Sequence, residues 1–220
     1  MQDQETAFPL EEAPPEAAAP VRKRPKPGER RLQILQTLAA MLEQPGGDRI
    51  TTAALAARLS VSEAALYRHF ASKAQMYEGL IDFIEQSVFT LTQQIAGREL
   101  PDASRTPEQA VAQAHRVVAM VLQFGERNPG MVRVMLGDAL LSEHPRLQQR
   151  MRQFFDRIES TLRQCLRVTV GDSITPTVDA HVRASVLMAL VQGRLLRFAR
   201  SDFRQLPTEQ LPACLALLQH

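Results

Sequence analysis

Residues 50–76 combine two short helical patterns, a tight turn between them and the start of a third helix. In the first pattern, Leu55 and Leu59 recur at the spacing of a single buried helix face. Thr51 or Thr52 can cap its N-terminus, because a hydroxyl there accepts a hydrogen bond from a free backbone amide. Two short helices joined by a tight turn predict a helix-turn-helix.

The second helical pattern begins after the turn at residues 60–61. Ser62 is placed to cap this helix, and Glu63 stands in its first turn, where a carboxylate interacts favourably with the positive helix end. Leu66 and Phe70 form its buried edge, four residues apart. The positions that face outward are Glu63, Ala64, Tyr67 and Arg68. Small and polar groups there suit the major groove of DNA, since a recognition helix presents its N-terminal turns to the base edges.

This segment resembles the DNA-binding domain of the TetR family of bacterial regulators, which commonly reads VSxxxLYxHFxxK here. The matching residues are Val61, Ser62, Leu66, Tyr67, His69, Phe70 and Lys73. The resemblance implies that the polar-tipped Tyr67, His69 and Lys73 contact backbone phosphates. The family commonly has glycine where this chain has Ser60. If that position needs a positive φ, serine costs about 1 kcal/mol relative to glycine.

Charge is distributed unevenly ahead of the helix-turn-helix. Residues 1–20 contain five acidic residues and no Lys or Arg, and this Pro-rich leader is expected to stay flexible. Residues 21–31 invert the balance with Arg22, Lys23, Arg24, Lys26, Arg30 and Arg31. Such a basic arm can lie along phosphates or enter a minor groove, although a solvated linker has the same composition. The residues predicted to contact DNA are Arg24, Thr51, Thr52, Ser62, Glu63, Ala64, Tyr67, Arg68, His69 and Lys73.

From residue 29 onward the sequence is almost entirely helical in pattern, with breaks at Pro, Gly and capping residues. We expect an all-α, TetR-like fold of about nine helices. Its expected parts are a leader and basic arm at 1–28, a helix-turn-helix domain at 29–77, and a C-terminal helical dimerisation and partner-binding domain at 78–220. Ser72 is placed to cap a helix that reaches to about Ile95 and joins the two domains.

Composition restricts the class of protein. With 220 residues and 45% hydrophobic content the chain can bury a sizeable core, and no uninterrupted apolar run is long enough to cross a bilayer. We expect a cytoplasmic, nucleoid-associated protein without a membrane anchor. Cys165 and Cys214 lie among apolar neighbours in helical patterns, so we expect buried thiols rather than a disulfide or a metal pair.

The sequence offers no catalytic constellation. Its five histidines are scattered, and HExxH, CxxC and Gly-rich phosphate-loop motifs are absent. We therefore expect neither an enzyme nor a metal or cofactor site.

Small residues recur on the penultimate helical pattern at Ala184, Ala189 and Gly193. They let helices approach closely, either within one chain or across a subunit interface. We expect a homodimer, because a helix-turn-helix that reads palindromic double-stranded DNA needs two-fold symmetry. The family resemblance implies a four-helix interface formed by the last two long helices.

A narrower resemblance, to the nucleoid occlusion factors within the TetR family, extends over about residues 30–203. It is carried by RITTAALAARLSVSEAALYRHFASKAQMYEGLIDFIEQS and by QFGERNPGMVRVMLGDALL. This resemblance implies a DNA-bound dimer that also binds the tubulin-like division protein FtsZ and blocks assembly of a division ring over the chromosome. The alternative is a TetR-type transcriptional repressor controlled by a small apolar effector.

The same resemblance places the partner-binding residues at Phe83, Arg127 and Asn128. Phe83 could anchor an apolar side chain of an incoming peptide or could be an ordinary core residue. Arg127 could pair with an acidic peptide, but Arg127 and Asn128 also suit the end of a helix before Pro129. Nucleoid occlusion factors tend to carry a basic residue where this chain has Leu91, so the electrostatic part of partner binding is expected to differ.

Overall fold

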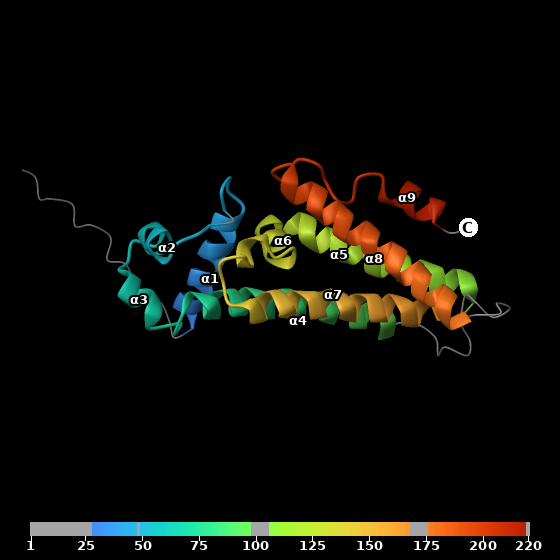
Figure 1. Ribbon diagram of the computed structural model, residues 1–220, viewed down its shortest axis with the longest axis horizontal. Helices are drawn as coiled ribbons and strands as arrows, with labels where there is room; N and C mark the ends of the chain where they lie inside the picture. The colour runs from blue at the N-terminus through green and yellow to red at the C-terminus, as the bar shows by residue number, and fades with distance from the viewer. Residues whose placement is uncertain (1–27, 48, 98–105, 168–175, 219–220) are drawn as a thin grey trace, which may run out of the picture.

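The computed structural model describes residues 28–47, 49–97, 106–167 and 176–218, and within them the chain is helical and has no β-strand (Figure 1). The elements are α1 (Glu29–Leu42), α2 (Thr52–Arg58), α3 (Glu63–Tyr67), α4 (Lys73–Gly97), α5 (Pro107–Arg127), α6 (Pro129–Met135), the 3-10 helix η2 (Asp138–Leu140), α7 (Pro145–Leu166), α8 (Pro176–Arg200) and α9 (Leu211–Leu217). The predicted all-α fold is confirmed, with nine α-helices in the described residues.

Helices α1, α2 and α3 form a small unit, here called the head, at one end of an elongated molecule (Figure 1). Its core consists of side chains that are at most 1% exposed: Ile34, Leu38, Leu42, Leu55, Leu66 and Phe70. These side chains come from all three helices and from the segment before α4. Of the residues predicted to form buried helix faces, Leu55, Leu66 and Phe70 belong to this core, whereas Leu59 is only partly buried.

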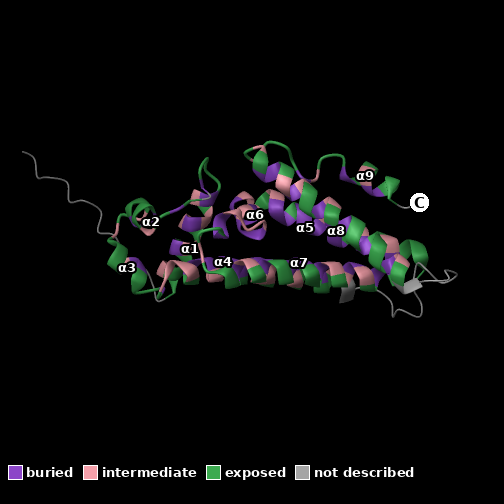
Figure 2. Cartoon of the chain, viewed as in Figure 1, coloured by how far each residue is buried: buried purple, intermediate pink, exposed green. Residues whose placement is uncertain are grey.

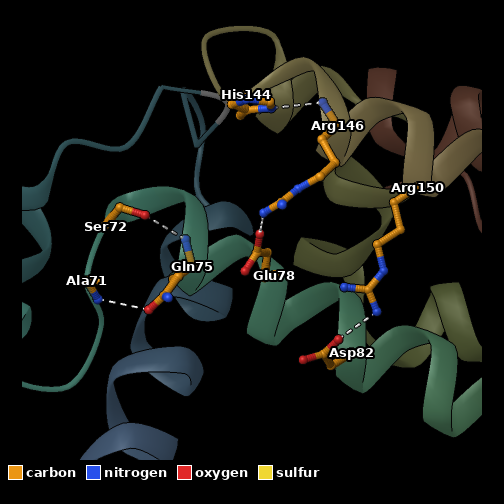
Figure 3. A network of polar contacts seen from close by, with 8 residues as sticks. All are labelled: Ala71, Ser72, Gln75, Glu78, Asp82, His144, Arg146 and Arg150. Atoms are coloured by element: carbon orange, nitrogen blue, oxygen red, sulfur yellow. Dashed lines mark hydrogen bonds and ion pairs between the residues drawn. The ribbon is translucent and has the colours of Figure 1, made fainter.

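Helix α4 connects the head to the rest of the chain. Ser72 Oγ accepts a hydrogen bond from the Gln75 amide (3.2 Å), and the Gln75 side-chain oxygen accepts one from the Ala71 amide (2.8 Å; Figure 3). These bonds fix the first turn, as predicted for Ser72. The 25 residues of α4 extend about 37 Å and pack on α1, α5, α6 and α7. One helix thus contacts both the head and the helices that follow.

Helices α5, α6, η2, α7 and α8 form the C-terminal bundle, whose interior is buried (Figure 2). A reciprocal capping box opens α5: Thr106 Oγ1 accepts from the Gln109 amide (3.3 Å), and Gln109 Oε1 accepts from the Thr106 amide (3.0 Å). The chain from Pro129 to Leu140 is divided into two elements, α6 and η2. The reason is Gly137, whose left-handed conformation (φ 87°) ends α6.

Helix α8 packs on α7 and on α5, and its outer face carries an exposed stripe of apolar and small residues, here called the α8 stripe. Its members are Val178, Val182, Val186, Ala189 and Gly193. Ala184 was expected to act with Ala189 and Gly193, but it is fully buried inside the chain. Five helical residues rotate a side chain by about 140°, so Ala184 and Ala189 cannot lie on the same face.

Neither cysteine forms a disulfide, and the two side chains have different surroundings. Cys165 is buried, as expected. Cys214 is only partly buried, which corrects the prediction, because α9 lies on the surface of the molecule rather than inside the bundle. Its sulfur accepts a hydrogen bond from Arg194 Nη2 (2.8 Å).

Candidate nucleic-acid interface

The turn between α2 and α3 requires a positive φ at Ser60. Ser60 has φ 54°, and its amide donates to the Ala57 carbonyl (3.0 Å). The amide of Val61 donates to the Ala56 carbonyl (3.0 Å), so two backbone bonds close the turn. The steric penalty of a side chain in the left-handed region therefore applies to Ser60.

Replacing Ser60 with glycine should raise the free energy of unfolding by about 1 kcal/mol, because glycine adopts a positive φ without a steric cost. In a chain of this size that gain corresponds to about 2–4 °C in melting temperature, measured by circular dichroism. Ser62→Gly serves as the control, since Ser62 has an ordinary φ of −78° and should gain nothing. If the Ser60→Gly protein melts at no higher temperature than the unsubstituted protein, the positive φ of Ser60 carries no steric cost.

Two threonines fix the start of α2 and its contact with α3. Thr51 Oγ1 accepts a hydrogen bond from the Ala54 amide (3.1 Å), which identifies Thr51 as the cap. Thr52 Oγ1 instead donates to Glu63 Oε2 (2.6 Å) in the first turn of α3. This bond joins the two helices across the turn and orients the Glu63 carboxylate.

Helix α3 shows the orientation that its sequence predicted. The exposed side chains are Glu63, Ala64, Tyr67 and Arg68, and Leu66 is only 1% exposed. Ser62 occupies the N-cap position, but its hydroxyl makes no capping hydrogen bond, which corrects the prediction. The Ala65 amide, which a capping hydroxyl could bind, donates to the Ser62 carbonyl instead (2.9 Å).

Arg31, on α1, supports the segment that follows α3. Its Nη1 donates to the His69 carbonyl (2.9 Å), and its guanidinium carbon lies 4.1 Å from the centre of the Phe70 ring. By sequence Arg31 belongs to the basic arm, and no local pattern indicates this contact across 38 residues. Arg24, the arm residue predicted to contact DNA, lies outside the described residues.

The three residues predicted to contact phosphates differ in their exposure to solvent and in their contacts with the rest of the chain. Tyr67 and His69 are exposed beside α3. The Lys73 side chain is only 26% exposed, and its Nζ lies 2.6 Å from Glu143 Oε1. The same ammonium lies 5.6 Å from the centre of the Tyr77 ring. Lys73 is therefore engaged with the segment before α7, while the other two side chains point to solvent.

The residues predicted to bind a partner lie where α4 and α5 pack together. Phe83 is 48% exposed, and its ring centre lies 6.2 Å from that of Phe124. Arg127 is exposed in the last turn of α5, three residues after Phe124 and so on the same side of the helix. Asn128 Nδ2 donates to the Phe124 carbonyl (2.8 Å), which makes Asn128 a cap of α5. Phe83 and Arg127 are thus both exposed and both adjoin Phe124, Phe83 through its ring and Arg127 one helical turn along α5, where Asn128 ends the helix.

In the part of the chain that the structure describes, no group of three or more His, Cys, Asp and Glu side chains is placed to hold a metal ion. No helix among these residues is both long and apolar enough to span a membrane.

Comparison with known families and structures identifies the fold. Residues 34–80 match the family described as bacterial regulatory proteins, tetR family, and residues 108–220 match the tetracyclin repressor-like, C-terminal domain. The TetR family transcriptional regulator PfmR from Thermus thermophilus has a similar structure, with a TM-score of 0.67 and 22% identity over 84% of this chain and 96% of that one. FadR from Bacillus subtilis, solved with stearoyl-CoA, has a TM-score of 0.61 and 12% identity over 85% and 96%. At these identities the structures establish the fold alone.

Closer relatives are found by sequence. The nucleoid occlusion factor SlmA of Idiomarina loihiensis is 49% identical over 185 residues, which cover 84% of this chain and 90% of that protein. SlmA of Vibrio cholerae serotype O1 is 47% identical over 193 residues, covering 86% and 93%. These matches span the head and the C-terminal bundle alike. The chain belongs to the SlmA family of nucleoid occlusion factors, which has the TetR fold.

Proposed function

We propose that the chain is a homodimeric DNA-binding nucleoid occlusion factor, which binds FtsZ and blocks assembly of the division ring over the chromosome. The observation that carries this proposal is identity of 47–49% to SlmA proteins over 84–86% of the chain. Its proposed location is the cytoplasm, in association with the nucleoid. Its proposed parts are the leader and basic arm at 1–28, the DNA-binding domain at 29–77 and the dimerisation and partner-binding domain at 78–220.

The proposed DNA interface is the exposed side of α3, inserted into the major groove. The small side chain of Ala64 allows close approach to the bases, and the Thr52–Glu63 bond holds a polar edge beside it. Tyr67, His69 and Lys73 then contact phosphates, which set the position of the helix along the groove. The basic arm adds further phosphate contacts and salt-dependent affinity.

The proposed dimer interface is the outer face of α7 and α8. The α8 stripe is continuous with an open groove of about 510 Å³ between η2, α7 and α8, which is lined in part by Leu141, Met151 and Leu196. Leu141 is 75% exposed at this groove. Exposing an apolar face of this length to water is unfavourable, so we expect another protein surface to cover it. A second copy of the chain would cover it and would also position two α3 helices to bind the two halves of a palindromic site.

The proposed partner surface is the exposed area of Phe83 and Arg127. A half-exposed aromatic ring beside a free guanidinium suits a peptide that combines an apolar side chain with acidic groups. Asn128 is proposed to complete this surface through the atoms that its capping bond leaves free. Leu91, 40% exposed two turns further along α4, extends the surface as an apolar rather than a basic group.

The test measures binding of the C-terminal tail of FtsZ by fluorescence anisotropy, with and without a saturating palindromic duplex. We expect binding of both ligands, and inhibition of GTP-dependent FtsZ polymers in sedimentation assays when the duplex is present. Failure to bind the tail in either state, combined with release from DNA by a small apolar compound, would instead identify an effector-controlled repressor.

A further inference from the structure

Lys73 and Glu143 form an ion pair between the first turn of α4 and the segment that leads into α7. The Glu143 side chain is only 8% exposed, so its carboxylate depends on the Lys73 ammonium for compensation of its charge. Lys73 is also one of the residues proposed to contact phosphate. While it is paired with Glu143, the two charges cancel and Lys73 offers the duplex no net positive charge.

Tyr77, one turn after Lys73, has its ring centre 5.6 Å from the Lys73 ammonium and supplies an unused hydrogen-bond donor next to this pair. Its side chain is 0% exposed, and its hydroxyl has no hydrogen-bond partner in the described part of the chain. Burial raises the pKa of this hydroxyl, and the nearby Glu143 carboxylate raises it further, so it remains a protonated donor. An unsatisfied buried donor beside a carboxylate is a second partner available to that carboxylate.

The Lys73–Glu143 pair is the first of three contacts along the α4–α7 seam, the line on which charged side chains of α4 meet those of α7 and of the segment before it. Further along, Arg146 pairs with Glu78, and Arg150 binds both Asp82 (2.6 Å) and Glu85 (2.7 Å). The first contact is nearest to the head, so it alone involves a residue of the proposed DNA interface.

The segment that carries Glu143 also reaches the proposed dimer interface. Leu141, two residues earlier, is 75% exposed at the groove between η2, α7 and α8. The Glu143 amide donates to the Leu140 carbonyl (3.1 Å), which makes residues 140–143 a tight turn. A change in the partner of Glu143 therefore acts on a turn that contributes directly to that groove.

We propose that a DNA phosphate and Glu143 compete for Lys73, and that Tyr77 takes the place of Lys73 at the Glu143 carboxylate when DNA is bound. This inference rests on the DNA interface proposed above and adds a route from DNA to the C-terminal bundle. Because coupling is reciprocal, any change that strengthens the Lys73–Glu143 ion pair weakens DNA binding, and DNA binding weakens that ion pair.

The first test compares DNA affinity among variants at fixed salt. Glu143→Gln frees Lys73 and should tighten binding to a palindromic duplex by about threefold to tenfold. In a Lys73→Gln background the same change should have no effect, as a double-mutant cycle requires for a direct pair. Asp82→Asn is the matched control, since it breaks a contact of the same seam without involving Lys73, and it should leave DNA affinity unchanged.

The second test follows Tyr77 directly, and its main measurement uses a protein in which Lys73 and Glu143 are unchanged. The chain has no Trp and two Tyr, so 3-fluorotyrosine gives two ¹⁹F resonances, which Tyr67→Phe assigns. Saturating duplex should shift the Tyr77 resonance, and Glu143→Gln should remove that shift. A Tyr77 resonance that stays in place when the duplex binds would overturn the exchange, even if Glu143→Gln failed to fold.

The outcomes separate this inference from the function on which it rests. If the unsubstituted protein binds no duplex, both the DNA interface and the exchange are wrong. If it binds while folded Glu143→Gln binds no more tightly, only the exchange is wrong. If Glu143→Gln tightens binding equally with and without Lys73, the effect is general electrostatics and the proposed competition is also wrong.

Discussion

Replacing Gly193 with arginine is expected to convert the protein to a monomer and to weaken its binding to a palindromic duplex by about 100-fold. Gly193 lies on the α8 stripe, and apart from its chain neighbours and the nearby backbone of α8 no atom comes within 4 Å of a Cβ built there, so the subunit itself has room for the new side chain. Arginine also has the higher helix propensity. The effect should therefore come from a charge placed in the subunit interface, which separates the two recognition helices.

Sedimentation velocity distinguishes the monomer of 24.6 kDa from a particle of twice that mass, and anisotropy with a labelled duplex gives the affinity. Ala112→Arg is the matched control, because Ala112 is a helical residue of α5 outside the α7–α8 face. It should leave both the mass and the affinity unchanged. If the Gly193→Arg protein still sediments as a dimer, the α8 stripe is not part of the dimer interface.

The features predicted correctly from the sequence are those set by local physical chemistry. Capping at Thr51 and Ser72, and the buried edge of Leu66 and Phe70, depend on residues within one or two helical turns of each other. The positive φ at Ser60 belongs to the same class, since a turn of fixed length imposes it. Such features need no knowledge of how the helices pack together.

The features that the sequence did not reveal arise from packing between distant segments. Arg31 belonged by composition to the basic arm, yet the fold brings it to the His69 carbonyl and the Phe70 ring. Lys73 matched a phosphate-contact pattern, but its pairing with Glu143 appears only once α4 and the segment before α7 are side by side. The prediction that Ala184 shares an outer face with Ala189 and Gly193 was wrong for a related reason. A small side chain can pack inside the chain or against a second subunit, and its sequence position does not distinguish the two.

Replacing Phe83 with alanine is expected to weaken binding of the FtsZ tail by about 30-fold, the typical loss when an aromatic anchor is truncated at the centre of an interface. DNA affinity should not change, because Phe83 belongs to α4 and contacts Phe124 of α5, and neither residue is part of the head. The side chain is already 48% exposed, so its removal should lower the free energy of unfolding by only about 1 kcal/mol. Tail binding and DNA binding are measured by anisotropy on the same preparation.

Two further variants separate the apolar and the charged parts of this surface. Arg127→Glu should weaken tail binding most at low salt, because charge reversal adds repulsion that ions screen, whereas the loss in Phe83→Ala should vary little with salt. Leu217→Ala is the control for removing an exposed apolar side chain, since Leu217 is 79% exposed on α9, and it should bind the tail normally. If Phe83→Ala loses DNA and tail binding in equal measure, the defect lies in folding. If it retains full tail affinity with a normal melting curve, the partner surface lies elsewhere on the bundle.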